Sequence, residues 1–244
     1  MTTMPILEND AEVRRDWQLV IHPDMVLRAQ GASPDRIRGR QPKLVSLAQR
    51  AIADGMTLIH PRAVLRSFKV AKRSRERLLL ENGTELQGSG IARKLTGAEM
   101  IAVAVATLGE ELDREIEERQ GRDLPYALAL DGFGTAAIGE LTNAITQQVH
   151  SLAEGMHLKA TKPLHPGTVD WDLSSGQAEI FSLVDARKVG VTLNASFLMT
   201  PRKSVSMLYG IGKSVKAGKS ACVNCGVSAR CMHKPASDVQ HVKR

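Results

Sequence analysis

The sequence has few aromatic side chains, because Phe, Trp and Tyr together make up only 3% of its 244 residues. We therefore expect a core built from Leu, Ile, Val, Ala and Met. Basic residues interleaved with aromatics, zinc-finger spacing and other nucleic-acid-binding motifs are also missing, so nothing in the sequence indicates a nucleic-acid-binding protein. The length suits a single domain with a tail and is ample for a packed core.

Long hydrophobic runs are absent as well. No stretch of about 18 consecutive apolar residues exists, so we expect no transmembrane helix and no membrane partner. The first ten residues lack the basic and apolar regions of a secretory signal. These two absences predict a cytoplasmic protein.

Negative charge is in short supply, since 33 Lys and Arg face 26 Asp and Glu, for a net charge of +7. The basic residues are scattered, with local excess at residues 69–77 and 202–219. A basic balance of this kind favours acidic partners in general.

Cysteine occurs only at Cys222, Cys225 and Cys231, within ten residues of one another. An odd, clustered set in a cytoplasmic chain argues against disulfides and for a metal site. Three thiolates suit an iron–sulfur cluster with one iron ligated by another group or left open, or zinc with His233 or another group as the fourth ligand. Three free thiols in a flexible tail are the remaining alternative.

The pattern of apolar residues predicts a mixture of helices and strands. We expect an irregular N-terminal stretch over residues 1–40, with a short helix after Ser33. The expected helices are 43–54, ended by Gly55, and then 110–119, 125–154 and 174–186. The expected strands are a hairpin over 77–86 around Asn82-Gly83, a buried central strand at 100–107, and strands at 189–193 and 204–209.

Residues 196–212 are the most informative segment. Arg202 and Lys203 come before a strand in which Ser204 begins a period-2 alternation. Gly210 and Gly212 close the strand, at positions where a backbone can approach a ligand closely. We expect a binding site at this segment.

This segment, together with Ala98–Gly109, Ala127–Glu140 and Pro166–Trp171, resembles the activation domain of cobalamin-dependent methionine synthase and the stand-alone proteins related to it. The blocks occur in the family's order, within residues 58–232. The resemblance implies an α+β fold, with a twisted, mainly antiparallel sheet and flanking helices. We divide the chain into an N-terminal arm (1–57), an activation-domain-like core (58–212) and a Cys-containing basic tail (213–244).

In that family a loop with the pattern Arg-x-x-Pro-Gly-Tyr binds S-adenosylmethionine. Pro166 and Gly167 match its Pro-Gly, and His165 stands beside them. Pro163 and Thr168 occupy the Arg and Tyr positions, with Lys162 one residue away as a substitute cation. Lysine lacks the two-pronged guanidinium that grips a carboxylate, so these departures put S-adenosylmethionine binding in question.

Further residues are assigned to a site that faces S-adenosylmethionine or the corrinoid. Tyr209 and Gly210 match the end of the family's strand, and Glu140 matches a glutamate of its long helix, where a carboxylate can pair with a ligand ammonium. Arg202, Lys203 and Ser204 are placed to contact the corrinoid's amides or phosphate. For Tyr209 and Glu140, a rim tyrosine and a solvated helix glutamate are the plain alternatives. We assign no catalytic residue.

The resemblance implies a protein that supports reductive reactivation of a corrinoid methyltransferase system. It would act with a corrinoid protein or cobalamin-dependent methyltransferase as partner, and remethylation would use S-adenosylmethionine. If it is an enzyme, it is a methyltransferase of the methionine synthase reactivation type. Iron–sulfur is the favoured metal because stand-alone relatives carry a similar cysteine-rich end. The alternative is a non-catalytic iron–sulfur or zinc-binding subunit of such a system.

Overall fold

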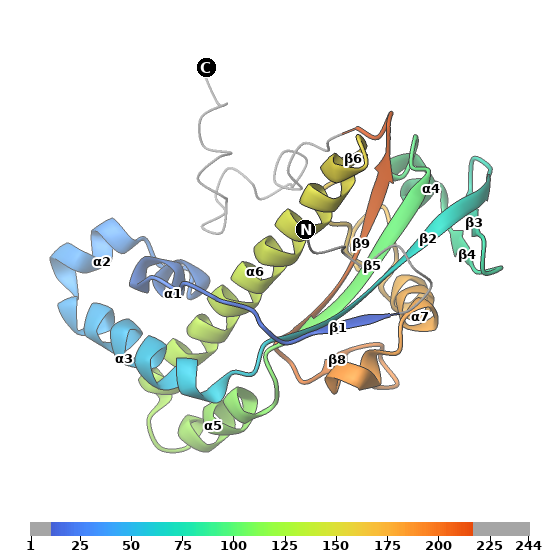
Figure 1. Cartoon of the computed structure of the whole chain (residues 1–244). Coiled ribbons are helices and arrows are strands. Elements are labelled where there is room, and N and C mark those ends of the chain that lie inside the picture. Colours follow the sequence, from blue (N-terminus) through green and yellow to red (C-terminus); the bar gives the residue numbers. More distant parts are fainter. Residues whose placement is uncertain (1–10, 217–244) are drawn as a thin grey trace.

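The computed structural model describes residues 11–216, which form an α+β fold with a long helix lying along an antiparallel sheet (Figure 1). The strands are β1 (Glu12–Arg14), β2 (Arg62–Arg73), β3 (Arg77–Leu80), β4 (Glu85–Gln87), β5 (Met100–Thr107), β6 (Lys159–Ala160), β7 (Thr192–Leu193), β8 (Met199–Thr200) and β9 (Ser204–Gly212). The helices are α1 (Pro23–Ala29), α2 (Pro34–Arg40), α3 (Pro42–Leu58), α4 (Ser89–Lys94), α5 (Glu111–Gln120), α6 (Leu124–Gly155), α7 (Leu173–Leu183) and the short 3-10 helix η2 (Ala186–Val189).

The main sheet of the described residues has the strand order β4-β3-β2-β5-β9-β6, with β1 paired to β2 as a seventh strand. Every pairing is antiparallel. β5 lies in the middle and pairs along its whole length with β2 on one side and β9 on the other. The expected fold class, the expected central strand at 100–107 and the expected hairpin after Arg77 are confirmed.

The sheet separates two apolar cores, and β5 contributes small residues to one and larger ones to the other. Ala102, Ala104 and Ala106 face the α6 side. Ile101, Val103 and Val105 face the side covered by α4, α7 and η2. Alanine on the α6 side lets the helix approach the sheet closely, which accounts for a large core with few aromatic rings.

α6 is the dominant helix, with 32 residues and a length of about 48 Å. Glycine inside a helix costs about 1 kcal/mol relative to alanine, so its interior glycines need a compensating contact. A Cβ on Gly132 would lie 3.0 Å from the carbonyl oxygen of Val26 in α1, and one on Gly134 would lie 2.8 Å from Leu112 of α5. Gly139, by contrast, has no atom within 4 Å of its Cβ position. Close packing therefore explains two of these glycines but not Gly139.

The short helix expected after Ser33 is confirmed as α2, but the expectation of an otherwise irregular stretch over residues 1–40 is wrong for its described part, which also holds β1 and α1. α1 and α3 pack on α6, and Val26 and Leu27 are fully buried in the α6-side core. Gly55 does not end α3, which continues to Leu58. Gly55 instead allows close packing, because a Cβ there would lie 2.4 Å from the ring of Phe133.

Two expectations near the C-terminal part of the chain need adjustment. The strand expected at 189–193 is reduced to Thr192–Leu193, because the preceding residues form η2 and a left-handed turn at Gly190. The strand expected at 204–209 is confirmed and runs on to Gly212. Within residues 11–216, no helix is both long and apolar enough to cross a membrane.

Candidate functional site

A pocket of about 410 Å³ opens at the start of β9, on the face of the sheet that α7 covers. Period-2 alternation turns Ser204 and Ser206 toward this face, while Met207 and Tyr209 belong to the α6-side core. The other walls come from the loop after β6 (His165, Pro166), from α7 (Leu173, Gln177) and from the turn before β9 (Phe197, Leu198, Met199, Arg202).

His165 presents a hydrogen-bond acceptor at this pocket. Its Nδ1 lies 3.0 Å from the carbonyl oxygen of Ser206. A carbonyl can only accept, so Nδ1 carries the proton and Nε2 of the neutral ring is an acceptor. Burial lowers the pKa of His165 below its ordinary value, although the bond to Ser206 opposes this. The ring is therefore held neutral.

Gln177 supplies a second acceptor. It lies on α7, is only 3% exposed and lines the pocket. Its Oε1 is buried and has no hydrogen-bond partner within residues 11–216. Leaving a buried acceptor unpaired costs about 1–3 kcal/mol. This atom is thus ready to accept a hydrogen bond from a donor in the pocket.

Phe197 forms the outer wall and has a strained backbone. Its φ is 59°, in the left-handed region that bulky residues rarely adopt. Asn194 holds the turn, since its Oδ1 accepts hydrogen bonds from the N–H groups of Ser196 (2.9 Å) and Leu198 (3.0 Å). Such strain clusters at binding sites, where it fixes a side chain in place.

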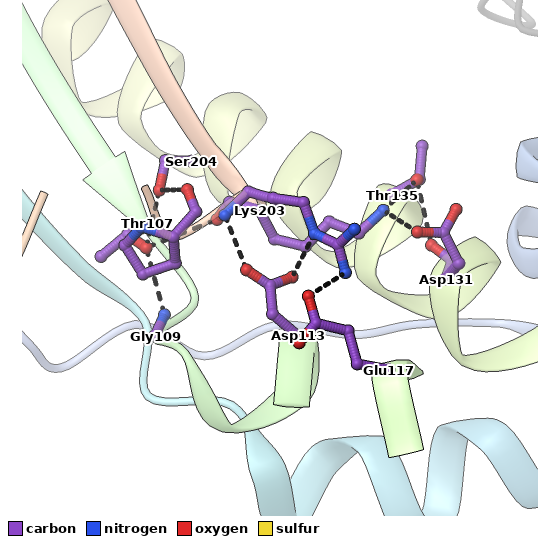
Figure 2. A network of polar contacts seen from close by, with 10 residues as sticks. Thr107, Gly109, Asp113, Glu117, Asp131, Thr135, Lys203 and Ser204 are labelled. Atoms are coloured by element: carbon purple, nitrogen blue, oxygen red, sulfur yellow. Dashed lines mark hydrogen bonds and ion pairs between the residues drawn. The ribbon is translucent and has the colours of Figure 1, made fainter. Parts of the chain in front are cut away.

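Arg202 lies at the edge of the pocket, but its polar groups are engaged by α5. Asp113 Oδ2 accepts a hydrogen bond from the Arg202 main-chain N–H at 2.6 Å. The Arg202 guanidinium lies 3.3 Å from a carboxylate oxygen of Glu117. Figure 2 shows both acids reaching from α5 to the segment that precedes β9. Arg202 therefore ties that segment to α5.

Lys203 is also engaged within the fold, by α6. Its Nζ lies 2.7 Å from Asp131 Oδ1 and 3.0 Å from Thr135 Oγ1 (Figure 2). The hydroxyl of Ser204 lies 2.9 Å from that of Thr107, at the end of β5. The two cations predicted to face the corrinoid thus have acidic partners in this structure.

Tyr209, Glu140 and Gly210 do not line this pocket. The Tyr209 side chain is fully buried in the α6-side core, and its hydroxyl lies 2.9 Å from Thr146 Oγ1 of α6. Burial also raises its pKa above the ordinary value. Glu140 lies on α6, where its carboxylate accepts a hydrogen bond from Asn143 at 3.0 Å. The structure therefore separates Tyr209 and Glu140 from His165 by the thickness of the sheet.

Gly210 occupies a tight place on β9, because a Cβ there would lie 2.9 Å from Leu95 and 3.1 Å from Ala98. Its main-chain N–H donates to Thr161 Oγ1 at 3.0 Å. Close packing of the chain explains this glycine.

The Pro166-Gly167 turn has a structural role as well. Gly167 has a φ of 83°, and its N–H donates to the carbonyl oxygen of Trp171 at 2.9 Å. Trp171 is buried, and its Nε1 donates to Glu179 of α7 at 3.0 Å. The turn thus docks the loop on α7. Lys162, at the start of this loop, is exposed.

The predicted metal ligands Cys222, Cys225 and Cys231 lie outside the described residues. Among residues 11–216, no group of three His, Cys, Asp or Glu side chains could hold a metal ion.

Several lining residues were not predicted as site residues, and Gln177 and Phe197 are the two with a distinctive geometry. Phe197 lies inside the segment 196–212, where a binding site was expected, and it is one of only four phenylalanines. These two facts together are a weak sequence signal for a site residue. Gln177 carries no local signal, because its burial depends on how α7 docks against the sheet.

Comparison with known proteins shows the fold. No family model and no curated protein matches the chain. Among solved structures, the chain is similar to the MetH reactivation domain bound to AdoHcy, with a TM-score of 0.56 and 16% identical residues. The match covers 88% of this chain and 82% of that one. The chain therefore has the fold of that domain.

Proposed function

We propose that this protein supports the reactivation of a cobalamin-dependent methyltransferase system and that the pocket beside His165 binds S-adenosylmethionine. The observation that carries the proposal is the likeness of fold, over most of both chains, to a reactivation domain whose solved structure holds AdoHcy. A fold hosts many functions, so the chemistry of the pocket has to support the assignment independently.

The pocket suits a ligand that donates hydrogen bonds. The residues that line it include two acceptors, the buried Gln177 Oε1, which has no partner within residues 11–216, and Nε2 of the neutral His165 ring. S-adenosylmethionine offers donors at its adenine amine and its ammonium group, and it carries a positive sulfonium. A neutral His165 avoids repulsion with that charge. Phe197 provides a ring face for the adenine, and Leu198 and Met199 add apolar contact.

The ligand carboxylate would require a cation. Arg202 lies at the pocket edge but is paired with Glu117, and Lys162 is exposed on the neighbouring loop. Lys162 would act as a point charge without the two parallel N–H donors of an arginine, whereas Arg202 has those donors but would have to leave Glu117. Bound S-adenosylmethionine would supply the methyl group, and this chain would orient it and exclude water while the corrinoid carries the demanding chemistry.

The corrinoid would belong to a partner protein. The net charge of +7 supports docking on an acidic surface. The cluster of Cys222, Cys225 and Cys231 stays a predicted iron–sulfur or zinc site that would serve electron delivery or hold the tail.

Isothermal titration of the full chain with S-adenosylmethionine and AdoHcy tests the proposal. We expect saturable binding that Gln177→Leu weakens about tenfold, since a hydrogen bond to a charged donor contributes about 1.5–3 kcal/mol. The matched control is Gln148→Leu, because Gln148 on α6 is also buried with unpaired amide atoms among the described residues but does not line the pocket. Phe197→Gly should weaken binding without unfolding the protein, because glycine tolerates the positive φ.

An absence of binding in the wild-type chain would contradict the S-adenosylmethionine assignment. Co-purification with a corrinoid protein in that case would support the second candidate function, a non-catalytic subunit. The engagement of Arg202 and Lys203 by acidic partners within the fold favours this alternative.

A further inference from the structure

A second hollow, of about 470 Å³, lies elsewhere on the α7 side of the sheet and shares no lining residue with the first pocket. Arg66 of β2 forms one wall, and residues between Phe181 and Leu193 form the others. They come from the end of α7, from η2, from β7 and from the residues between them, and η2 packs against β2.

Arg66 is a cation with no anionic partner among the residues that the structure describes. Its guanidinium lies 4.8 Å from the centre of the Phe68 ring. Its Nε is buried, has no hydrogen-bond partner and belongs to no ion pair within residues 11–216. Guanidinium stays charged at all relevant pH values, and a buried N–H without an acceptor is costly. The arrangement therefore favours an anion that reaches Arg66 from the hollow.

The remaining charges of the hollow cancel one another. Arg187 holds Asp185 through two contacts, Nε to Oδ1 at 2.8 Å and Nη2 to Oδ2 at 3.3 Å. The hydrogen bond from Arg187 lowers the pKa of Asp185, so this carboxylate stays ionised and remains paired with Arg187. Arg66 is thus the one uncompensated charge among the described residues that line the hollow.

Beside Arg66, the lining includes the partly exposed apolar side chains of Phe181 and Leu193, together with the polar Ser182 and Thr192. One positive charge beside apolar surface matches a ligand with one negative charge and a hydrocarbon body. A phosphate dianion would bring a second charge that nothing there neutralises, at a desolvation cost. The volume lies within the usual range for small-molecule sites.

We propose that this hollow binds a small carboxylic acid with an apolar body. The Arg66 guanidinium donates two hydrogen bonds to the carboxylate, and Phe181 and Leu193 contact the hydrocarbon part. The site is independent of the proposed S-adenosylmethionine pocket.

The test titrates the full chain with hexanoate, acetate and 1-hexanol and follows amide shifts by NMR. Hexanoate should bind saturably and at least tenfold more tightly than either acetate, which lacks the body, or hexanol, which lacks the charge. Arg66→Met should weaken hexanoate binding tenfold or more. Arg66→Lys keeps the positive charge but loses the two parallel N–H donors, so it should weaken binding less. Lys69→Met, which removes an exposed cation of the same strand, is the matched control and should change nothing.

Equal affinity for hexanoate and hexanol, an absence of saturable binding, or hexanoate binding that survives Arg66→Met would each overturn the proposal. If Arg66→Met fails to fold, the comparison of Arg66→Lys with wild type decides. S-adenosylmethionine binding by the Arg66 variants should match wild type whatever the result, so a failure here is distinct from a failure of the proposed function.

Discussion

Single residues decide the polarity of the candidate pocket, and His165 is the clearest case. Its burial lowers its pKa, whereas in the unfolded chain the ring takes up a proton near the ordinary value of about 6.5. The buried neutral ring therefore costs no stability at a pH above about 6.5. As the pH falls below about 6.5, the unfolded state binds more protons than the folded state, and the folded protein loses stability.

We predict that His165→Asn makes the free energy of unfolding less dependent on pH between 7.5 and 5. Asparagine can keep the hydrogen bond to the Ser206 carbonyl but does not titrate. One histidine contributes at most about 1.4 kcal/mol per pH unit to this dependence. Urea denaturation of both proteins at several pH values measures it, and identical slopes would show that His165 is not held neutral.

Among the elements, the contact between α3 and α6 depends on Gly55, which was expected to end a helix but lies within α3. We predict that Gly55→Ala destabilises the protein by about 1–3 kcal/mol, because the added methyl group overlaps the Phe133 ring. Gly139→Ala is the matched change in open space on α6 and should stabilise by up to about 1 kcal/mol. Thermal unfolding of the two variants checks the pair, and a gain of stability in both would contradict the close packing.

At the scale of the whole molecule, residues 11–57 share one apolar core with the rest of the described chain. Val26, Leu27, Ala48 and Ala51 are fully buried in the cluster that includes the α6-side residues of the sheet. We predict that a chain starting at residue 58 loses cooperative unfolding, because α6 would expose the surface that α1 and α3 cover. Circular dichroism melting with a dye for exposed apolar surface measures this. A cooperative transition near that of the full chain would support a separable N-terminal arm.

Local patterns in the sequence are enough to predict several elements. A continuous apolar run predicted β5, the Asn82-Gly83 turn predicted the β3–β4 hairpin, and a long stretch rich in Ala, Leu and Ile predicted α6. These predictions succeed because hydrogen bonding and side-chain direction within an element depend on neighbours in the sequence. The fold class followed from the order of these elements and from the family resemblance.

The folded structure brings together or separates residues that local patterns leave unplaced. It put Tyr209 and His165 on opposite sides of the sheet, paired Arg202 and Lys203 with acids of α5 and α6, and left Gln177 and Arg66 with unpaired buried atoms among the described residues. Such contacts join residues far apart in the sequence, and they depend on how each helix docks against the sheet. No local pattern encodes that docking, because packing and burial are properties of the folded chain as a whole.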